Sequence, residues 1–343
     1  MTVAPAAGPH RGRPVVGVLL GDPGGVGPEL AVKLLARPGN FGRADVVVLG
    51  DPRVLALGER AAGVRLDAAR VAQVDALTFE RGRPTLVAFD WIADDELAVG
   101  RATPASGRAV LASLATAADA ARAGAIDGIL FAPLNKQAMR LAGMAEEDEM
   151  RFLQHRFDVA AFVTEFNITG KLWTSRVTSH IPLSAVAAAV TADGVREAVR
   201  IIDRALRAAG VARPRIAVAG LNPHAGDGGS FGREEIDVIL PAVRSLVAEG
   251  LDARGPFPAD TVFVAARRGD FDAVVTMYHD QGQIAMKLMG FEQGVTLLAG
   301  LPVPVATCAS GTAFDIAGKG TARVDGLQQA FDLVVAMSAA RAA

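Results

Sequence analysis

Length, composition and charge set the first limits on this chain. It has 343 residues, 51% of them hydrophobic, which is more than one core usually supports and predicts two domains. A formal net charge of −2 supplies no basic field for nucleic acid, which we therefore exclude as a partner. Cys308 is the only cysteine, so the chain has no internal disulfide and suits a reducing cytoplasm.

The sequence predicts neither a membrane span nor a secretion signal. No stretch reaches the roughly 18 unbroken apolar residues of a span. Residues 1–13 are broken by prolines, lack an apolar centre and predict a loose tail. We therefore expect a soluble, cytoplasmic protein without a membrane partner.

Strand-like and helix-like segments alternate along the chain. The first part predicts strands at 15–20, 45–49 and 128–131, a helix opening at 30–35 and a helix at 105–123. The middle third predicts three strands that each precede a histidine, with helices at 194–209 and 233–249 between them. This alternation is typical of βα units around a mostly parallel sheet. Glycine and proline density predicts one α/β domain from residues 1–134 plus 298–343 and another from residues 135–297.

Three of the five histidines follow apolar runs that we predict as buried strands. His180, His224 and His279 each end such a run. Crevices at the carboxyl ends of strands are where open α/β sheets bind ligands. A lone histidine there is more often a hydrogen-bonded structural residue, but three converging imidazoles favour a divalent metal. His10, in the predicted tail, and His155, in a charged stretch, are assigned no site.

The surroundings of two of these histidines support the interpretation. His224 lies in a glycine-rich loop, residues 222–229, whose missing side chains allow backbone to approach a ligand closely. His279 is followed by the polar run Asp280-Gln281-Gly282, which a purely structural turn does not need.

Two lysines and a second glycine-rich loop are further candidates. Lys136 directly follows a predicted buried strand and could hold an anion or stabilise a developing enolate. Lys287 is equally compatible with a substrate contact and with a lysine whose stem lies along a helix surface. The loop at 21–29, GDPGGVGPE, matches neither nucleotide fingerprint, so a tight turn is as compatible as ligand contact. Its polar residues are Asp22 and Glu29.

Seven motifs, spread in order over nearly the whole chain, together carry a family resemblance. They are GDPGGVGPEL, TEF at 164–166, SHIPLSAV, GLNPHAGDGGSFGREEID, GPFPADTVF, MYHDQGQIAMKLMGF and GTAFDIAGKG. The set resembles the 4-hydroxythreonine-4-phosphate dehydrogenase family of vitamin B6 biosynthesis. The last motif also resembles the cofactor loop of isopropylmalate and isocitrate dehydrogenases. The resemblance implies their two-domain α/β/α fold, a site in the interdomain cleft, and a homodimer with the site completed at its interface.

The same resemblance implies an activity and a set of roles. It implies oxidation of a secondary alcohol next to a carboxylate on a small hydroxy acid, by NAD or NADP with a divalent metal, and it allows decarboxylation. The metal would be zinc, cobalt, nickel, manganese or magnesium, and its implied ligands are the three histidines named above. The resemblance further implies catalytic Asp260 and Asp280, substrate-binding Thr164 and Lys287, and cofactor-binding Gly311, Thr312 and Asp315. To these we add Lys136 as catalytic from its place after a strand, Thr296 as substrate-binding and Ser310, whose hydroxyl could bond the cofactor, as cofactor-binding.

Four positions depart from the family pattern. Val163, Thr296, Val305 and Ser310 stand where the family has histidine, asparagine, arginine and histidine. Replacing an arginine by valine removes a forked anion contact, which leaves recognition of a 4-phosphate open. The alternative substrate is a cis-dihydrodiol carboxylate, as in terephthalate breakdown.

Two other functional classes stay open at this point. A non-catalytic metabolite-binding paralogue is disfavoured because the histidines are retained. A metal-dependent hydrolase is disfavoured because no nucleophile constellation of serine or carboxylate accompanies them. The sequence leaves the substrate, the choice between NAD and NADP, and the metal undecided.

Overall fold

The computed structural model describes residues 12–290 and 293–342, and the chain divides into two compact units. Unit 1 comprises Met1–Val163 with Leu301–Ala343, and unit 2 comprises Thr164–Gly300. The sequence-based division places its boundaries after residues 134 and 297, whereas residues 135–163 cluster here with unit 1. The predicted tail lies outside the described residues up to residue 11, and His10 lies there with it.

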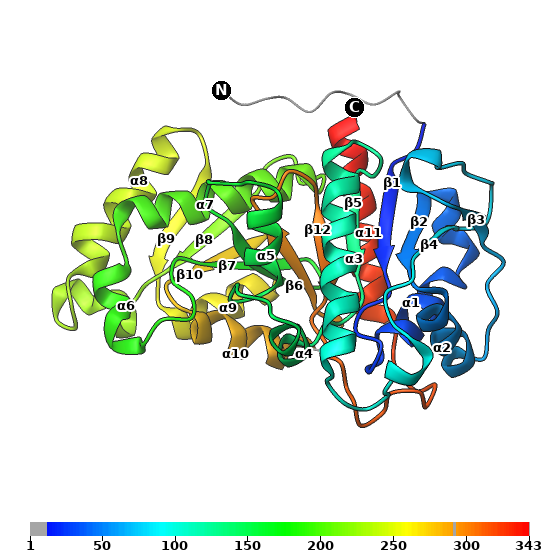
Figure 1. Cartoon of the computed structure of the whole chain (residues 1–343). Coiled ribbons are helices and arrows are strands. Elements are labelled where there is room, and N and C mark those ends of the chain that lie inside the picture. The colour runs from blue at the N-terminus through cyan, green and yellow to red at the C-terminus, as the bar shows by residue number, and fades with distance from the viewer. Residues whose placement is uncertain (1–11, 291–292, 343) are drawn as a thin grey trace. The chain divides into compact units, whose positions relative to one another are not determined.

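Unit 1 is built on a parallel sheet with the strand order β3-β4-β2-β1-β5-β12 (Figure 1). Its strands are β1 Val15–Leu19, β2 Asp45–Gly50, β3 Ala69–Val71, β4 Thr85–Ala88, β5 Gly128–Phe131 and β12 Val305–Cys308. The central strands are continuous apolar runs because helices cover both faces of a parallel sheet. The strands predicted at 15–20, 45–49 and 128–131 are confirmed to within one residue at each end.

Helices pack on this sheet from both sides. The helix α3 lies over β1, β2 and β5, and α11 lies over β1, β5 and β12, with α1 beside it (Figure 1). The helices of unit 1 are α1 Gly27–Leu35, α2 Pro52–Ala62, α3 Pro104–Arg122, α4 Lys136–Leu141, α5 Glu149–Arg156 and α11 Asp325–Ala342, with short turns η1 Pro38–Gly42, η2 Val74–Ala76 and η3 Asp94–Glu96. The helix predicted to open at Leu30 begins earlier, at Gly27. That difference arises because Pro28, whose fixed φ suits a first helical turn, is inside the helix.

Unit 2 has a mixed sheet with the strand order β11-β6-β7-β10-β8-β9. Its strands are β6 Thr164–Thr169, β7 Leu172–Arg176, β8 Arg215–Ala219, β9 Asp252–Phe257, β10 Ala273–Thr276 and β11 Val295–Ala299. The strands β7, β10, β8 and β9 are parallel, and β6 is antiparallel to both β7 and β11. Three of these parallel strands are the predicted ones that precede histidines.

The helices of unit 2 also lie on two sides of their sheet. Figure 1 shows α7 and α8 on one side and α9 and α10 on the other. Their bounds are α6 Leu183–Ala189, α7 Ala192–Ala208, α8 Leu240–Ala248, α9 Ala259–Arg267 and α10 His279–Gly290, with the short elements η4 Pro223–Gly229 and η5 Glu235–Ile239. The helix predicted at 233–249 is a wider π turn, η5, that continues into α8. Both units are therefore α/β/α layers, as predicted.

Within the described ranges, no helix combines the length and apolar character needed to cross a bilayer.

Candidate active site

The three candidate histidines follow three neighbouring parallel strands of unit 2. β7 ends at Arg176, β10 at Thr276 and β8 at Ala219, and β10 pairs with both of the others. His180 comes shortly after β7 and His224 shortly after β8. His279 comes shortly after β10, as the first residue of α10. Because these strands are parallel and adjacent, their carboxyl ends meet at one edge, which we call the histidine edge.

Two of the three imidazoles lie close together. The ring centroids of His180 and His279 are 5.8 Å apart, with their planes inclined by 45°. The ring of His224 lies 6.1 Å from the ring of Phe231. All three histidines are among the described residues, and their nitrogens are not all within 4.8 Å of one another. The structure thus pairs His180 with His279 and places His224 after β8, the other neighbour of β10 at the same edge.

Backbone strain is concentrated at this edge. Among the described residues, six that are not glycine have positive φ. They include His180 at 21° and His224 at 53°, together with Ala225 and Asp227 in the same loop. Such conformations persist only where the surrounding structure enforces them, and they cluster at functional sites.

A buried carboxylate enforces the conformation of the His224 loop. Glu235 accepts hydrogen bonds from the backbone N–H groups of Leu221 and Asn222, both at 2.7 Å, and from the Asn222 side chain at 3.0 Å. A Cβ at Gly226 would lie 2.7 Å from the same carboxylate. Gly226 is therefore needed for the loop to close over Glu235. This is a structural reason for the glycine, beside the close approach of a ligand that the sequence predicted.

The donor set at the histidine edge fits a divalent metal. His279 Nδ1 lies 2.7 Å from Asp280 Oδ1, and because a carboxylate oxygen accepts, Nδ1–H donates and Nε2 is the ring nitrogen left for a metal. Metal-bound histidines commonly use their other ring nitrogen in this way, which fixes the ring orientation. Neutral imidazoles of this kind are typical ligands of zinc and its first-row neighbours.

The predicted substrate residues of unit 2 lie on different elements. Thr164 is the buried first residue of β6. Because β6 runs antiparallel to β7, Thr164 lies at the edge where β7 ends. Thr296 lies further from that edge, on β11 opposite Asn167. Lys287 is exposed, two turns beyond His279 on α10.

The predicted catalytic Asp260 is exposed in the first turn of α9. That helix contacts η4, the loop that carries His224. The side chain of Asp260 is therefore on an element adjacent to the histidine edge.

Sequence reasoning missed a buried ion pair next to this edge. Arg176, at the end of β7, donates to Glu165 at 3.0 Å and to Asn167 at 3.1 Å. Its Nε also donates at 2.9 Å to Ser179, the residue before His180. The available signal was a charged residue at the end of a strand that we predicted to be buried. Its role is to tie β6 to the turn that presents His180.

The predicted cofactor loop packs on the glycine-rich loop of unit 1. Val26 N donates to Thr312 O at 2.9 Å, and Asn135 Nδ2 lies 3.4 Å from Thr312 Oγ1. A Cβ at Gly25 would lie 2.7 Å from Thr312 O, so only glycine allows this approach. By contrast, a Cβ at Gly311 would meet nothing within 4 Å, which leaves that side of the loop open. A backbone cradle with an open side, at the carboxyl end of a parallel strand, fits a dinucleotide.

The other two predicted cofactor residues lie at the ends of this loop. Ser310 donates to the buried Cys308 Sγ at 3.2 Å, and Asp315 is exposed.

The two acidic residues of the glycine-rich loop have different surroundings. Glu29 is buried in α1 and accepts hydrogen bonds from Lys33 Nζ at 2.7 Å, Ala322 N at 2.8 Å and Gly320 N at 3.2 Å. It therefore holds the far end of the cofactor loop in place.

Asp22 is also fully buried. Its Oδ1 accepts from Gly24 N at 2.7 Å, whereas Oδ2 has no hydrogen-bond partner in the described part of the chain. Burial raises the pKa of Asp22 to about 6, against the lowering effect of the Gly24 hydrogen bond.

Lys136 is the first residue of α4 in unit 1 and is half exposed. Its Nζ lies 3.9 Å from Asp148 and 3.8 Å from Glu149. The acidic neighbours hold the ammonium group near the start of α5. His155, to which no site was assigned, pairs with Glu146 at 2.9 Å on the surface.

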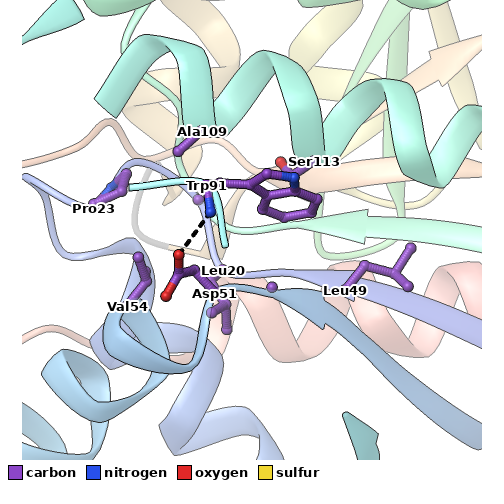
Figure 2. A pocket seen from close by; sticks show the side chains of 10 residues that line it. Leu20, Pro23, Leu49, Asp51, Val54, Trp91, Ala109 and Ser113 are labelled. Atoms are coloured by element: carbon purple, nitrogen blue, oxygen red, sulfur yellow. Dashed lines mark hydrogen bonds between the residues drawn. The ribbon is translucent and has the colours of Figure 1, made fainter. Parts of the chain in front are cut away.

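Unit 1 also has a pocket that the sequence did not predict (Figure 2). It encloses about 250 Å³, partly open to solvent, where β1 and β2 end. Its walls include Leu20, Leu49, Val54, Trp91, Ala109 and Ser113. Figure 2 shows the Asp51 carboxylate below Trp91, whose backbone N–H donates to it at 2.9 Å. Arg53 also donates two hydrogen bonds to the Asp51 carboxylate, at 3.0 and 2.8 Å. Because this carboxylate is already paired, the pocket offers a ligand mainly apolar contacts.

Comparison with known proteins supplies the class. The family model of the pyridoxal phosphate biosynthetic protein PdxA matches residues 43–334. A candidate 4-hydroxythreonine-4-phosphate dehydrogenase of Pseudomonas aeruginosa is 47% identical over 94% of this chain and 97% of its own length. A candidate D-threonate 4-phosphate dehydrogenase of Oceanobacillus iheyensis is 37% identical over 94% of this chain and 98% of its own.

Solved structures agree with these relatives. The 4-hydroxythreonine-4-phosphate dehydrogenase of Klebsiella pneumoniae matches with a TM-score of 0.82 and 34% identity, covering 95% of this chain and 98% of that one. The terephthalate 1,2-cis-dihydrodiol dehydrogenase of Burkholderia xenovorans matches with a TM-score of 0.67 and 31% identity, covering 94% and 98%. A β-decarboxylating dehydrogenase of Thermococcus kodakarensis, 14% identical at a TM-score of 0.50 over 92% of this chain and 81% of that one, shares the fold alone.

The α/β/α layers and these matches define an oxidoreductase. More particularly, the chain belongs to the PdxA family and is a dehydrogenase of that family. The family resemblance of the seven sequence motifs is thereby confirmed.

Proposed function

We propose that this dehydrogenase oxidises the secondary alcohol of a small hydroxy acid, with NAD or NADP as hydride acceptor and a divalent metal at the histidine edge. The observation that carries the proposal is the position of the three histidines after three adjacent parallel strands, with Asp280 on Nδ1 of His279. A module that only binds a metabolite has no need of such a donor set.

His180, His224 and His279 would hold the metal. When bound, the cation supplies Lewis acidity to a hydroxyl and its neighbouring carboxylate, and it can stabilise the enolate of a later decarboxylation. The chain's part is to keep the ligands oriented. Asp280 accepts a hydrogen bond from His279 Nδ1–H and so orients that ring. Arg176 fixes the turn before His180 through its hydrogen bond to Ser179.

Further side chains would bind substrate and move protons. We assign substrate contacts to Thr164, Thr296 and Lys287, the last as a cation for an anionic group. We assign to Asp260 the role of accepting a proton, because it is an exposed carboxylate on a helix that contacts the His224 loop. Lys136 would stabilise negative charge that develops on the substrate.

The nicotinamide cofactor would bind to unit 1. Ser310, Gly311, Thr312 and Asp315 form the loop that lies against Gly25, and Gly311 faces open space. Hydride chemistry belongs to the nicotinamide, so these residues need only hold and orient it.

We further propose a homodimer formed through unit 2. Large apolar side chains are exposed in the segments after His180 and His224 and on α10. They are Ile181, Leu183, Phe231, Ile284 and Leu288, with Leu288 83% exposed. Unit 1 also exposes large apolar side chains, at Val64, Val99, Leu141 and Phe162, but more of them lie on unit 2, and such groups are common at protein interfaces. A partner subunit here would shield the histidine edge from water.

The substrate that we favour is a 4-phosphorylated hydroxy acid, such as 4-phosphohydroxythreonine or D-threonate 4-phosphate. Support comes from the names of the relatives at 37–47% identity. The second candidate is a cis-dihydrodiol carboxylate. It is favoured by Val305 and Val163, which are apolar and buried where the family pattern has arginine and histidine.

A substrate panel tests both candidates. The purified chain, loaded with zinc, is assayed for NADH and NADPH formation with 4-phosphohydroxythreonine, D-threonate 4-phosphate and the terephthalate cis-dihydrodiol. We expect turnover of at least one phosphate ester that is lost with chelator and restored by metal. Turnover of the dihydrodiol alone would overturn the phosphate assignment. Metal-independent turnover would overturn the role of the histidine edge.

A further inference from the structure

A continuous set of hydrogen bonds crosses the ends of β7, β10 and β8. Met277, the residue after β10, lies at its centre. Its carbonyl accepts from Thr178 N at 3.1 Å and from Thr178 Oγ1 at 2.8 Å. Its N–H donates to Gln281 Oε1 at 2.8 Å, and Gln281 Nε2 donates to Gly220 O at 3.0 Å. The set therefore runs from the end of β7, through β10, to the end of β8.

These bonds begin where the sheet ladder stops. β10 pairs with β7 as far as Thr276 opposite Arg176, and with β8 only as far as Val275 opposite Val218. Beyond that point Gly220 N turns away to bond Phe257 O of β9. Gln281 thus supplies, from a side chain, the contact between β8 and β10 that the backbone no longer makes.

Each anchor of the set lies next to a histidine. Thr178 stands two residues before His180, Met277 stands two residues before His279, and Gly220 opens the loop to His224. Gln281 itself is in the first turn of α10, which begins at His279. Its two bonds therefore connect the helix that presents His279 with the strand that presents His224.

We propose that Gln281 is a positioning residue that sets the separation of His224 from His279 at the histidine edge. The inference rests on the metal centre proposed above. The primary amide of Gln281 donates and accepts at once, through Nε2 and Oε1. A carboxylate at position 281 could still accept from Met277 N but would face Gly220 O without a proton, and a thioether could do neither. Glu235 holds the strained His224 loop internally, whereas Gln281 ties the start of that loop, at Gly220, to the helix that presents His279.

The test measures zinc binding by the metal-free full chain, in competition with a chromophoric chelator. The variants are Gln281→Met, Gln281→Glu and a matched control, Gln154→Met. Like Gln281, Gln154 makes two hydrogen bonds from its amide to backbone groups, but it lies in unit 1. Its Nε2 donates to Val159 O at 3.0 Å and to Ala161 O at 3.1 Å. Loss of a residue that orients metal ligands typically weakens binding by about 10- to 100-fold. We expect that loss for Gln281→Met, an intermediate loss for Gln281→Glu and the parental affinity for Gln154→Met.

Two further measurements keep the outcome decisive. The thermal melt of each metal-free variant shows whether it is folded, and His180→Ala reports on the metal centre itself. If the parent binds zinc and His180→Ala does not, while Gln281→Met binds as the parent does, the positioning role is refuted and the metal centre stands. A parent that binds no zinc refutes the metal centre and the positioning role together. A Gln281→Met variant that is unfolded without metal, while Gln281→Glu is folded with parental affinity, also refutes the role.

Discussion

The two units use the same part of a parallel sheet in different ways. In unit 1, the loop after β1 works through backbone, because Gly25 lets Thr312 approach and buried Glu29 holds the far end of the cofactor loop. In unit 2, the histidine edge works through side chains that extend from strained turns, as at His180 and His224. Carboxyl ends of strands are thus a general location for a site, whereas the residue types that follow them decide its chemistry.

This contrast has a physical consequence for substitution. At Gly25 in unit 1, adding an atom is harmful because Thr312 leaves no room for it. In unit 2, removing a donor is harmful because nothing nearby replaces it. The predictions below test each side of the contrast, starting with the largest expected effect.

His279→Ala should remove an imidazole from the pair with His180 and leave the fold intact. We expect zinc affinity and metal-dependent turnover to fall by at least about 100-fold, since a metal ligand and the Lewis acid it holds are lost. Because His279 is partly exposed, the free energy of unfolding should change by less than about 1 kcal/mol.

Zinc titration and urea unfolding measure the two quantities for His279→Ala. The control is His155→Ala, which removes a surface imidazole of unit 1 paired with Glu146. Equal zinc affinity in the parent and in His279→Ala would contradict the assignment.

Gly25→Ala should harm unit 1 by adding one methyl group. The new Cβ would lie 2.7 Å from Thr312 O and 2.8 Å from Thr312 Cβ, so the cofactor loop has to move. We expect unfolding to become easier by about 2 to 3 kcal/mol, and the KM for the nicotinamide cofactor to rise. The matched control is Gly39→Ala, whose Cβ would meet nothing within 4 Å.

Urea unfolding of both glycine variants, with a titration of cofactor in the assay, gives the comparison. If Gly25→Ala were as stable as Gly39→Ala and kept the parental KM, the loop contact would not have the importance that we give it.

Asp22→Asn should stabilise the protein in a way that depends on pH. The pKa of Asp22 is about 6 when folded, above its ordinary value of 3.8, so the folded state binds more protons between these values. The parent therefore loses stability as pH rises from about 4 to about 6, whereas Asp22→Asn does not. Relative to its value near pH 4, we expect the stability advantage of the variant to grow by about 2 to 3 kcal/mol above pH 7.

Urea unfolding at several pH values from 4 to 8 measures this difference. An offset between Asp22→Asn and the parent that is the same at every pH would argue against a buried, reluctantly ionised carboxyl. Glu29→Gln is a useful contrast, because Glu29 accepts hydrogen bonds at both oxygens and should lose stability instead.

The sequence predicted much of this architecture because its signals are local. Alternating apolar runs and helix-stop residues gave the strands and helices of both units. The three histidines were found because each follows such a run. The start of α1 at Gly27 was missed because Pro28 reads as a break in a pattern, although it is favourable in a first helical turn.

Other features could not be read from the chain because they depend on pairing between distant segments. The order β7-β10-β8 decides that the strand before His279 lies between the strands before His180 and His224. The antiparallel course of β6 decides that Thr164 starts at the same edge as these strand ends.

By itself, then, the sequence determined the α/β class, the family and the residue types that follow the strands, since composition and periodicity act over a few residues. Only the tertiary structure decided which of two similar acidic residues is satisfied, Glu29 with three donors, and which is not, Asp22 with one. It also decided that Gln281, one polar residue among several, bridges two strands. Burial and hydrogen-bond partners arise from segments far apart in the chain, and no local pattern encodes them.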